Sequence, residues 1–149
     1  MAVQPNDRTT TSANVILLLS VRNFFPVPQQ IQGFASDEMI STEALNNIEA
    51  SIGADGRLSA GFTPAATPMT ITLQADSLSN DFFEQVQAAQ SQAREAFIFD
   101  GTYIMSSVGK KYDLVRGFMQ GGPKFASARR TLQPRPWVIT WEQVTPALT

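Results

Sequence analysis

The chain has 149 residues, of which 43% are hydrophobic and 16% are charged, and this composition is typical of one folded domain with a single core. It contains no cysteine and no histidine, which excludes disulfides, thiol nucleophiles and every catalytic pair that uses histidine as the base. The formal net charge is −2, which argues against a dedicated nucleic-acid-binding module. We expect one domain over residues 1–149, with a flexible N-terminal arm at about residues 1–13.

The first predicted element is a strand over residues 15–21 that is apolar on both faces. Leu17 and Leu19 belong to one face, whereas Ile16 and Leu18 belong to the other. Because successive strand residues point to opposite faces, one set fits the domain core and the other set needs a second cover. We therefore expect Ile16 and Leu18 to contact a neighbouring subunit.

Two short segments, 47–52 and 57–62, alternate apolar and polar residues and predict strands with one buried face. A two-residue Asp-Gly turn would pair the apolar face of one strand with the polar face of the other. A three-residue loop over residues 54–56, with Gly56 in the left-handed conformation, restores the match. The predicted register pairs Ile52 with Leu58, Ala50 with Ala60, and Ile48 with Phe62.

A third alternating segment, 69–75, predicts another strand with its apolar side in the core. The opposite side of all three segments is small and polar, and we expect it to meet water. It includes Glu49, Ser51, Ser59, Thr70 and Thr72.

The period changes at Asn80, where we predict a helix that runs to about Glu95. Asp81 and Glu84 suit the positive N-terminal end of a helix. The apolar stripe has three- and four-residue spacing and contains Phe82, Phe83, Val86, Ala89 and Ala93. The other side is rich in glutamine and includes Gln87. A solvated face would usually carry more lysine and glutamate, so we expect this side to meet a partner.

The last third of the chain returns to strand patterns. We predict strands near 97–99, 102–107, 112–119 and 137–143, with a glycine-rich loop before the last of them. The final strand places Trp137, Ile139 and Trp141 on one face, which adds a large apolar area to the core. Pro134 and Pro136 mark its beginning and favour an edge position.

Charge is distributed unevenly along the chain. Residues 1–100 carry eleven acids and four bases, whereas residues 101–149 carry two acids and seven bases. We expect a positive surface region that contains Lys110, Lys111, Lys124, Arg129, Arg130 and Arg135. Such a region suits contacts with another protein, and solvated loops are the alternative.

The order of elements is several strands, one helix and several strands, without a βαβ rhythm. It predicts a mainly β fold, an antiparallel β-sandwich or partial barrel with one flanking α-helix. No nucleotide-binding loop, calcium loop or zinc pattern occurs in the sequence, and we expect no cofactor and no metal. No apolar run reaches the roughly 18 residues that a membrane helix needs, so we expect no membrane insertion.

Two other classes of function stay open at this point. A carboxylate enzyme could use the pair Asp37 and Glu38, or the pair Glu43 and Glu49. A monomeric β-barrel carrier could bury a ligand among its large apolar side chains. The candidates for that role are Phe62, Met69, Met105 and Met119, which also suit an ordinary core.

Three parts of the sequence together resemble the tail tube proteins of contractile-tailed phages. They are the strands from Asn47 to Ala75, the beginning of the helix at Leu78-Ser79-Asn80-Asp81, and the closing Arg116-Gly117-Phe118, Gly122-Pro123 and Pro136-Trp137-Val138-Ile139. The similarity spans roughly residues 14–143. It implies a structural protein that is not an enzyme, whose hexameric rings stack into a tube around a channel for DNA.

The resemblance also implies partners and a place in the particle. Sheath, baseplate and neck proteins would contact the tube, DNA would pass through it transiently, and the tail would be assembled in the host cytoplasm and located in the virion. We place Glu49, Ser51, Ser59, Thr70 and Thr72 at the channel, where negative and small side chains would not hold DNA. Contacts with subunits or sheath are assigned to Ile16, Leu18, Gln87, Lys110, Lys111, Arg129 and Arg130. Tube subunits of secretion systems, noncontractile tails and baseplates are the alternatives.

Overall fold

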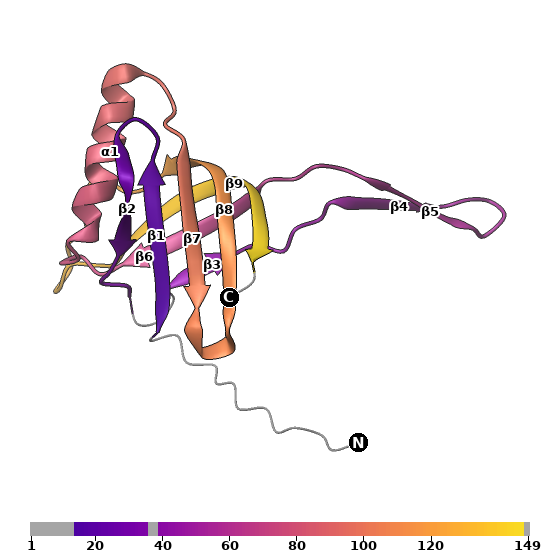
Figure 1. Ribbon diagram of the computed structural model, residues 1–149, viewed down its shortest axis with the longest axis horizontal. Coiled ribbons are helices and arrows are strands. Elements are labelled where there is room, and N and C mark those ends of the chain that lie inside the picture. The colour runs from indigo at the N-terminus through magenta and orange to yellow at the C-terminus, as the bar shows by residue number, and fades with distance from the viewer. Residues whose placement is uncertain (1–13, 36–38, 148–149) are drawn as a thin grey trace, which may run out of the picture.

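The computed structural model describes residues 14–35 and 39–147, so the predicted arm at residues 1–13 lies outside the described residues. Within these ranges the chain forms one α-helix, one short 3-10 helix and nine strands (Figure 1). The strands are β1 (Val15–Val21), β2 (Phe25–Ile31), β3 (Ile40–Thr42), β4 (Ile48–Ile52), β5 (Leu58–Phe62), β6 (Thr67–Leu73), β7 (Phe99–Met105), β8 (Lys110–Gly121) and β9 (Arg135–Ala147). The helices are α1 (Ser79–Ala93) and the 3-10 turn Ser106–Val108.

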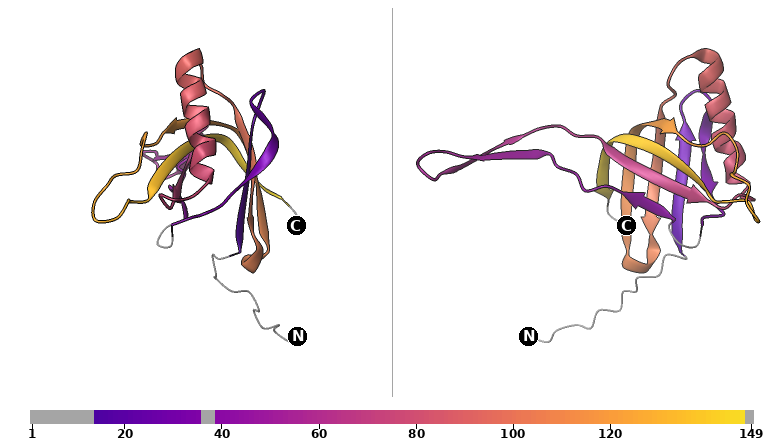
Figure 2. Two further views of the ribbon diagram at one scale, coloured as in Figure 1. Left: turned by 90° about the vertical axis from the view of Figure 1, so that its left-hand side faces the viewer. Right: turned by 180° about the vertical axis from the view of Figure 1, so that it is seen from behind.

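Seven strands form a single antiparallel sheet in the order β2-β1-β7-β8-β9-β6-β3, and β4 and β5 form a separate pair. β9 joins the two halves of the large sheet, because its residues 135–141 pair with β6 while its residues 138–147 pair with β8. Figure 2 shows the sheet curled into two layers with α1 across one end. The predicted antiparallel sandwich or partial barrel with one flanking helix is confirmed.

The core lies between the two layers and is built by the alternation that the sequence displays. Leu17, Leu19 and Val21 of β1 are buried, whereas Ile16 and Leu18 on its other face are half-buried. On β9, Trp137, Ile139 and Trp141 are fully buried, as their shared face predicts. Two buried Trp side chains supply a large part of the apolar area that stabilises so short a chain.

Helix α1 closes one end of the curved sheet by means of its aromatic stripe. Phe83 stacks on Trp137 with ring centroids 5.2 Å apart, and Phe82 contacts Phe25 with centroids 5.0 Å apart. Val86 is also fully buried, while Ala93 at the end of the predicted stripe is exposed. The apolar stripe therefore meets the core over the first two turns only.

The sequence analysis does not predict β2 and β3, because β2 contains prolines and β3 is very short. β2 contains Pro26 and Pro28, which normally indicate a loop, but β2 is an edge of the sheet where a missing N–H is tolerated. β3 has three residues and forms the other edge. Short or proline-bearing edges also protect a sheet from uncontrolled pairing with other chains.

The prolines at the beginning of β9 predict an edge strand, and this prediction is wrong. β9 lies inside the sheet, between β8 and β6. Its pairing with β8 begins at Val138, however, so Pro136 lies where β9 pairs with β6 alone. A proline at this point costs no hydrogen bond to a second neighbour.

The two strands predicted near 97–99 and 102–107 are one strand, β7, with Gly101 in its middle. A Cβ at Gly101 would lie 2.6 Å from the carbonyl oxygen of Leu18. The glycine is therefore required by the close approach of β1, rather than by a break in the strand.

Candidate functional site: the projecting hairpin and the apolar pocket

The hairpin of β4 and β5 adopts the predicted register. Ile52 pairs with Leu58, Ala50 with Ala60, and Ile48 with Phe62. Gly56 has φ +82°, its N–H donates to the carbonyl oxygen of Gly53 at 2.9 Å, and the N–H of Gly53 donates to Arg57 at 2.9 Å. This is the three-residue loop with a left-handed glycine that the apolar pattern demands.

The apolar face of this hairpin is not buried, which corrects the expectation of one buried face. Figure 1 and Figure 2 show the hairpin extending away from the curved sheet. Ile48, Ile52, Leu58 and Phe62 expose 50%, 72%, 70% and 69% of their surface. Alternation correctly predicts which residues share a face, but it cannot say whether the same chain covers that face. We call these four residues the hairpin face.

The residues predicted to line a channel fall on two separate sheets. Ser51 and Ser59 are cross-strand partners on the polar side of the hairpin, and Glu49 lies on the same side. Thr70 and Thr72 lie on β6, on the opposite face from the buried Met69, Ile71 and Leu73. The hairpin residues are thus together, whereas the two threonines belong to the body.

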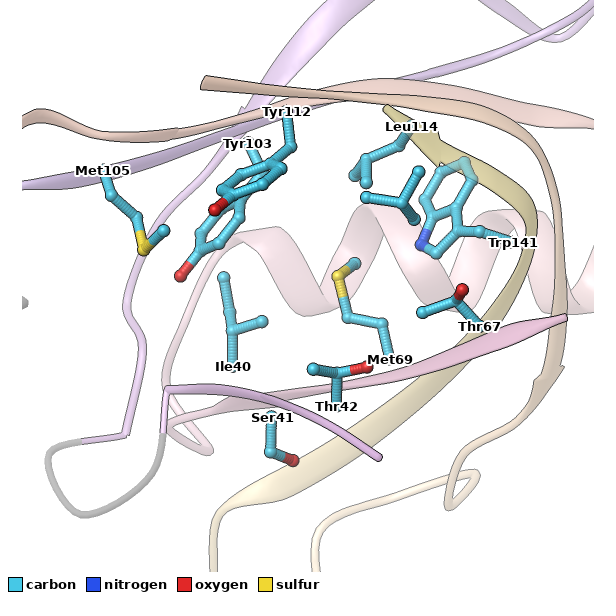
Figure 3. A pocket seen from close by; sticks show the side chains of 11 residues that line it. Ile40, Ser41, Thr42, Thr67, Met69, Tyr103, Met105, Tyr112, Leu114 and Trp141 are labelled. Atoms are coloured by element: carbon cyan, nitrogen blue, oxygen red, sulfur yellow. The ribbon is translucent and has the colours of Figure 1, made fainter. Parts of the chain in front are cut away.

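An apolar pocket of about 390 Å³ lies where the hairpin leaves the body. Thr42 and Thr67, which bound the segment that carries the hairpin, are among its lining residues. The remaining lining residues are Ile40, Ser41, Met69, Tyr103, Met105, Tyr112, Leu114, Trp141 and Val144. Figure 3 shows their side chains converging from strands β3, β6, β7, β8 and β9.

Two tyrosines form one wall of the pocket. The rings of Tyr103 and Tyr112 stack with centroids 6.3 Å apart and an interplanar angle of 24°. Burial raises the pKa of the Tyr103 hydroxyl, and the neighbouring Tyr112 raises it further. The Tyr103 hydroxyl therefore remains protonated at neutral pH and is available as a hydrogen-bond donor.

Trp141, which also lines the pocket, carries a buried donor. Trp141 is fully buried, and its indole Nε1 has no hydrogen-bond partner among the residues that the structure describes. Figure 3 shows this nitrogen on the side of the ring that faces Met69 and the pocket. A buried unsatisfied N–H costs about 1–3 kcal/mol, so an acceptor placed in the pocket would be favoured.

The pocket gathers only half of the residues proposed for a ligand carrier. Met69 and Met105 line it. Met119 is buried in the core away from the pocket lining, and Phe62 is exposed on the hairpin. Ordinary core packing accounts for Met119.

The predicted contact residues lie at several places on the surface. Ile16 and Leu18 are half-buried on the outer face of β1. Gln87 donates to the carbonyl oxygen of Gly122 at 3.3 Å, so this side chain already has a partner within the chain. Lys110 and Lys111 open β8 beside the pocket, and Arg129 and Arg130 are exposed in the loop before β9.

Arg135 does not belong to the positive surface region, so the prediction that placed it there is wrong. It is 4% exposed, forms an ion pair with Glu84 of α1, and lies over the ring of Trp137 at 4.9 Å. Its Nη2 also donates to the carbonyl oxygen of Pro123 at 2.9 Å. Burial of this base depends on an acid 51 positions away, which no local pattern reveals.

A second ion pair fixes the bulge where β7 meets β8. Arg22 holds the carboxylate of Asp100 through Nε at 2.7 Å and Nη2 at 3.1 Å, and the N–H of Arg116 donates to it at 3.2 Å. The hydrogen bond from Arg22 is the main reason that the pKa of Asp100 lies below its ordinary value. This group ties the loop after β1 to the middle of the sheet.

Residues 14–35 and 39–147 contain few other groups that could form a metal or catalytic site. No cluster of three acidic side chains suited to a metal ion occurs there, and α1 is too short and too polar to cross a membrane. The carboxylate pair Asp37 and Glu38 lies outside the described residues, and Glu43 and Glu49 are exposed.

Comparison with solved structures gives matches in the same class of particle at low sequence identity. A chain of the anti-feeding prophage baseplate, 6-fold symmetrised, matches with a TM-score of 0.55 and 7% identity, over 99% of this chain and 98% of that one. A chain of the sheath-tube complex of the extracellular contractile injection system PVC, in the extended state, gives 0.51 and 11%, over 89% and 88%. A chain of the anti-feeding prophage tube terminating cap gives 0.52 and 13%, over 100% and 95%. These likenesses establish a shared fold.

Comparison by sequence identifies the family. No curated protein matches the chain. The family described as "Tail fiber protein gp32" matches residues 8–145, which is nearly the whole chain. The expected resemblance to a phage tail protein is therefore confirmed, and the chain belongs to the tail fiber protein gp32 family.

Proposed function

We propose that this chain is a structural subunit of a phage tail tube, which forms stacked hexameric rings around a channel for DNA. The observation that carries the proposal is the hairpin face, whose four large apolar side chains are 50–72% exposed in the isolated chain. An isolated two-stranded hairpin is marginally stable in water, and exposed apolar patches mark protein interfaces. Such a hairpin is expected in a subunit whose neighbours cover the hairpin face.

The fold supports the same proposal. The three similar chains come from a baseplate, a sheath-tube complex and a tube terminating cap. All three are parts of contractile particles, so a structural role in the virion tail, with assembly in the host cytoplasm, is the simplest inference for this chain. A baseplate or cap subunit that forms one ring is the alternative, because the similar chains include both kinds.

The polar side of the hairpin is then proposed to face the channel. Glu49 with Ser51 and Ser59 presents negative charge and small hydroxyls, to which a phosphate backbone would not adhere. Thr70 and Thr72 on the outer face of β6 would extend this lining. A Glu49→Lys variant should assemble normally but slow DNA ejection, and an unchanged ejection rate would refute the lining.

The exposed bases before β9 are proposed to meet the sheath. Arg129 and Arg130 lie in an exposed loop, and paired charges at the rim of an interface guide association. An Arg129→Ala, Arg130→Ala variant should form intact tubes with reduced attachment of sheath. Normal attachment would assign this loop to solvent.

The function itself is tested by the assembly state of the purified chain. Negative-stain microscopy and sedimentation velocity over a concentration series should show rings with an open channel that stack into tubes. Single rings that do not stack would favour the baseplate or cap role. A monomer at every concentration, also after addition of a tail initiator complex, would contradict the proposal and favour the carrier.

A further inference from the structure

The apolar pocket lies between the two layers of the sheet and reaches buried side chains. Its lining residue Thr42 is exposed, whereas Met69, Leu114 and Trp141, which also line it, are buried. β3 and β6 form one side, and β7 and β8 form the other (Figure 3). Its volume of about 390 Å³ lies within the range, roughly 300–1,000 Å³, of pockets that hold small molecules. A site between two layers fits a compact molecule better than an added strand, which would pair along a sheet edge.

The lining predicts a ligand that is mostly apolar and carries no charge. Ile40, Met105 and Val144 add to the apolar surface that the buried residues provide. No aspartate, glutamate, lysine or arginine is among the described residues that line the pocket. A charged group placed there would lose its hydration without gaining a counter-charge, which costs far more than the burial of a neutral group.

Two hydrogen-bond donors distinguish this pocket from an ordinary gap in the core. The indole Nε1 of Trp141 is buried and has no acceptor within the part of the chain that the structure describes. The same atom of Trp137, which is also fully buried, donates to Asn80. The second donor in the pocket is the hydroxyl of Tyr103. An indole N–H can only donate, so the group that would satisfy Trp141 is an acceptor.

A methionine side chain controls access to the buried donor. Figure 3 shows the indole nitrogen of Trp141 on the side of its ring that faces Met69. Because this nitrogen is buried, a ligand reaches it only when a neighbouring side chain moves. A methionine side chain is unbranched and has three rotatable bonds, so Met69 can move aside at low cost. The indole N–H then becomes accessible from the pocket.

We infer that the pocket is a binding site for a small, uncharged and mostly apolar molecule whose carbonyl oxygen accepts a hydrogen bond from Nε1 of Trp141. The rings of Tyr103 and Tyr112, stacked with centroids 6.3 Å apart, offer a flat wall for its apolar part. A carbonyl suits the site better than a hydroxyl, because a hydroxyl hydrogen would itself need an acceptor in an apolar site. This inference goes beyond the proposed function, since it needs only the fold of one chain and adds a ligand to a structural subunit.

Three compounds of nearly the same shape test the chemistry of the site. They are methyl naphthyl ketone, which has the carbonyl group, ethylnaphthalene, which lacks it, and naphthoate, which is charged, all substituted at the same ring position. Isothermal titration calorimetry on the full chain measures their Kd values. The ketone should bind, and naphthoate should bind roughly tenfold more weakly or not at all. Absence of ketone binding, or tighter binding of naphthoate, would overturn the inference.

A Trp141→Phe variant identifies the donor. The substitution removes the N–H and retains an aromatic ring, so that both neutral compounds lose some contacts but only the ketone loses a hydrogen bond. The ratio of the Kd of the ketone to the Kd of ethylnaphthalene should therefore rise roughly twofold to tenfold over its value in the wild type. An unchanged ratio would show that Trp141 donates no hydrogen bond to the ligand, which contradicts the inference.

The indole signals provide a test that does not require a variant of Trp141 to fold. The chain contains two tryptophans, and Nε1 of Trp137 already donates to Asn80. In proton–nitrogen correlation spectra of the unassembled chain, the ketone should shift the indole proton of Trp141 downfield and leave that of Trp137 nearly unchanged. A Trp137→Phe variant assigns the two signals. A shift of the Trp137 signal alone, or of neither signal, would overturn the inference.

Val144→Trp tests the location of the ligand, and Gln143→Trp is its matched control. Val144 lines the pocket and pairs with Leu114, whereas Gln143 is exposed on the other face of β9. The larger side chain in place of Val144 should fill part of the pocket and weaken ketone binding roughly tenfold or more, while the control should bind as the wild type does. If Val144→Trp lowers the melting temperature, Thr42→Phe replaces it. Equal binding by the filled variant and the control would place the ligand elsewhere.

The outcomes separate this inference from the proposed function. Rings or tubes by microscopy, together with no binding of the ketone, would overturn the ligand site and leave the tube proposal intact. Binding of the ketone by a chain that remains a monomer would support the ligand site and contradict the tube proposal.

Discussion

The indole Nε1 of Trp137 donates a hydrogen bond of 3.0 Å to Oδ1 of Asn80, and both side chains are buried. The amide of Asn80 in turn donates to the carbonyl oxygen of Gln74 at 2.9 Å. One side chain therefore joins the first turn of α1 to β9 and to the end of β6. The sequence predicts a helix from Asn80 onward, and the hydrogen bonds of this side chain also tether the helix to the core.

Replacing Asn80 by Ala should lower the free energy of unfolding by about 1–3 kcal/mol, because the buried Trp137 N–H and the Gln74 carbonyl would lose their partner. Urea unfolding followed by Trp fluorescence measures this change. In a Trp137→Phe background the same Asn80→Ala substitution should cost less, because the indole donor is already gone. Equal costs in both backgrounds would show that the Asn80–Trp137 bond contributes nothing of its own.

The Arg135–Glu84 pair should contribute more to stability than an exposed pair in the same fold. The side chain of Arg135 is 5% exposed, whereas both partners of the Arg116–Glu142 pair, 3.5 Å apart, are at least half exposed. Glu84→Gln should cost about 1.5–3 kcal/mol, because it leaves a buried guanidinium short of its counter-charge. Glu142→Gln should cost at most about 1 kcal/mol. Similar thermal shifts for both variants would contradict the ranking.

The sequence predicts pairing within the hairpin better than it predicts what lies against it. The register of Ile52 with Leu58 follows from local alternation and from Gly56, and both are readable in a short window. Whether Leu58 is covered depends on where the arm is directed, which is a property of the whole fold. The same limit hides the pocket, whose walls come from strands as far apart in the chain as β3 and β9.

The sequence also does not reveal which charged residues are buried. Arg129 and Arg135 belong to one basic stretch, yet Arg129 is exposed and Arg135 is buried beneath α1. Composition assigns both to a positive surface. Only the partner, Glu84, distinguishes them.

The stability of the fold should fall in acid partly through Asp100. The hydrogen bond from Arg22 holds the pKa of this carboxyl below its ordinary value of about 3.9. Its contribution to stability is therefore complete above pH 3.9 and is lost as the pH falls through the lower pKa of the folded state. Asp100→Asn should flatten the stability profile below about pH 4, whereas Asp113→Asn on the same sheet serves as the control. Unfolding by urea between pH 2 and pH 6 compares the variants, and parallel profiles for wild type and Asp100→Asn would refute this role.

The hairpin face should matter to assembly and hardly at all to the folded monomer. Ile52 and Leu58 are 72% and 70% exposed, so replacing both by Ser removes little buried apolar area from the isolated chain. The melting temperature of the Ile52→Ser, Leu58→Ser variant, measured at low concentration, should therefore stay near that of the wild type.

In the assembled state each residue would be covered by a neighbour, and burial of such a side chain is worth about 1.5–3 kcal/mol. Two substitutions repeated at every contact should then abolish rings in sedimentation velocity, while Ser51→Thr with Ser59→Thr, on the polar side of the same strands, should leave them intact. If the apolar-face variant unfolds at a much lower temperature, the face is covered within the monomer. If it still forms rings, the hairpin is not the contact that holds the subunits together.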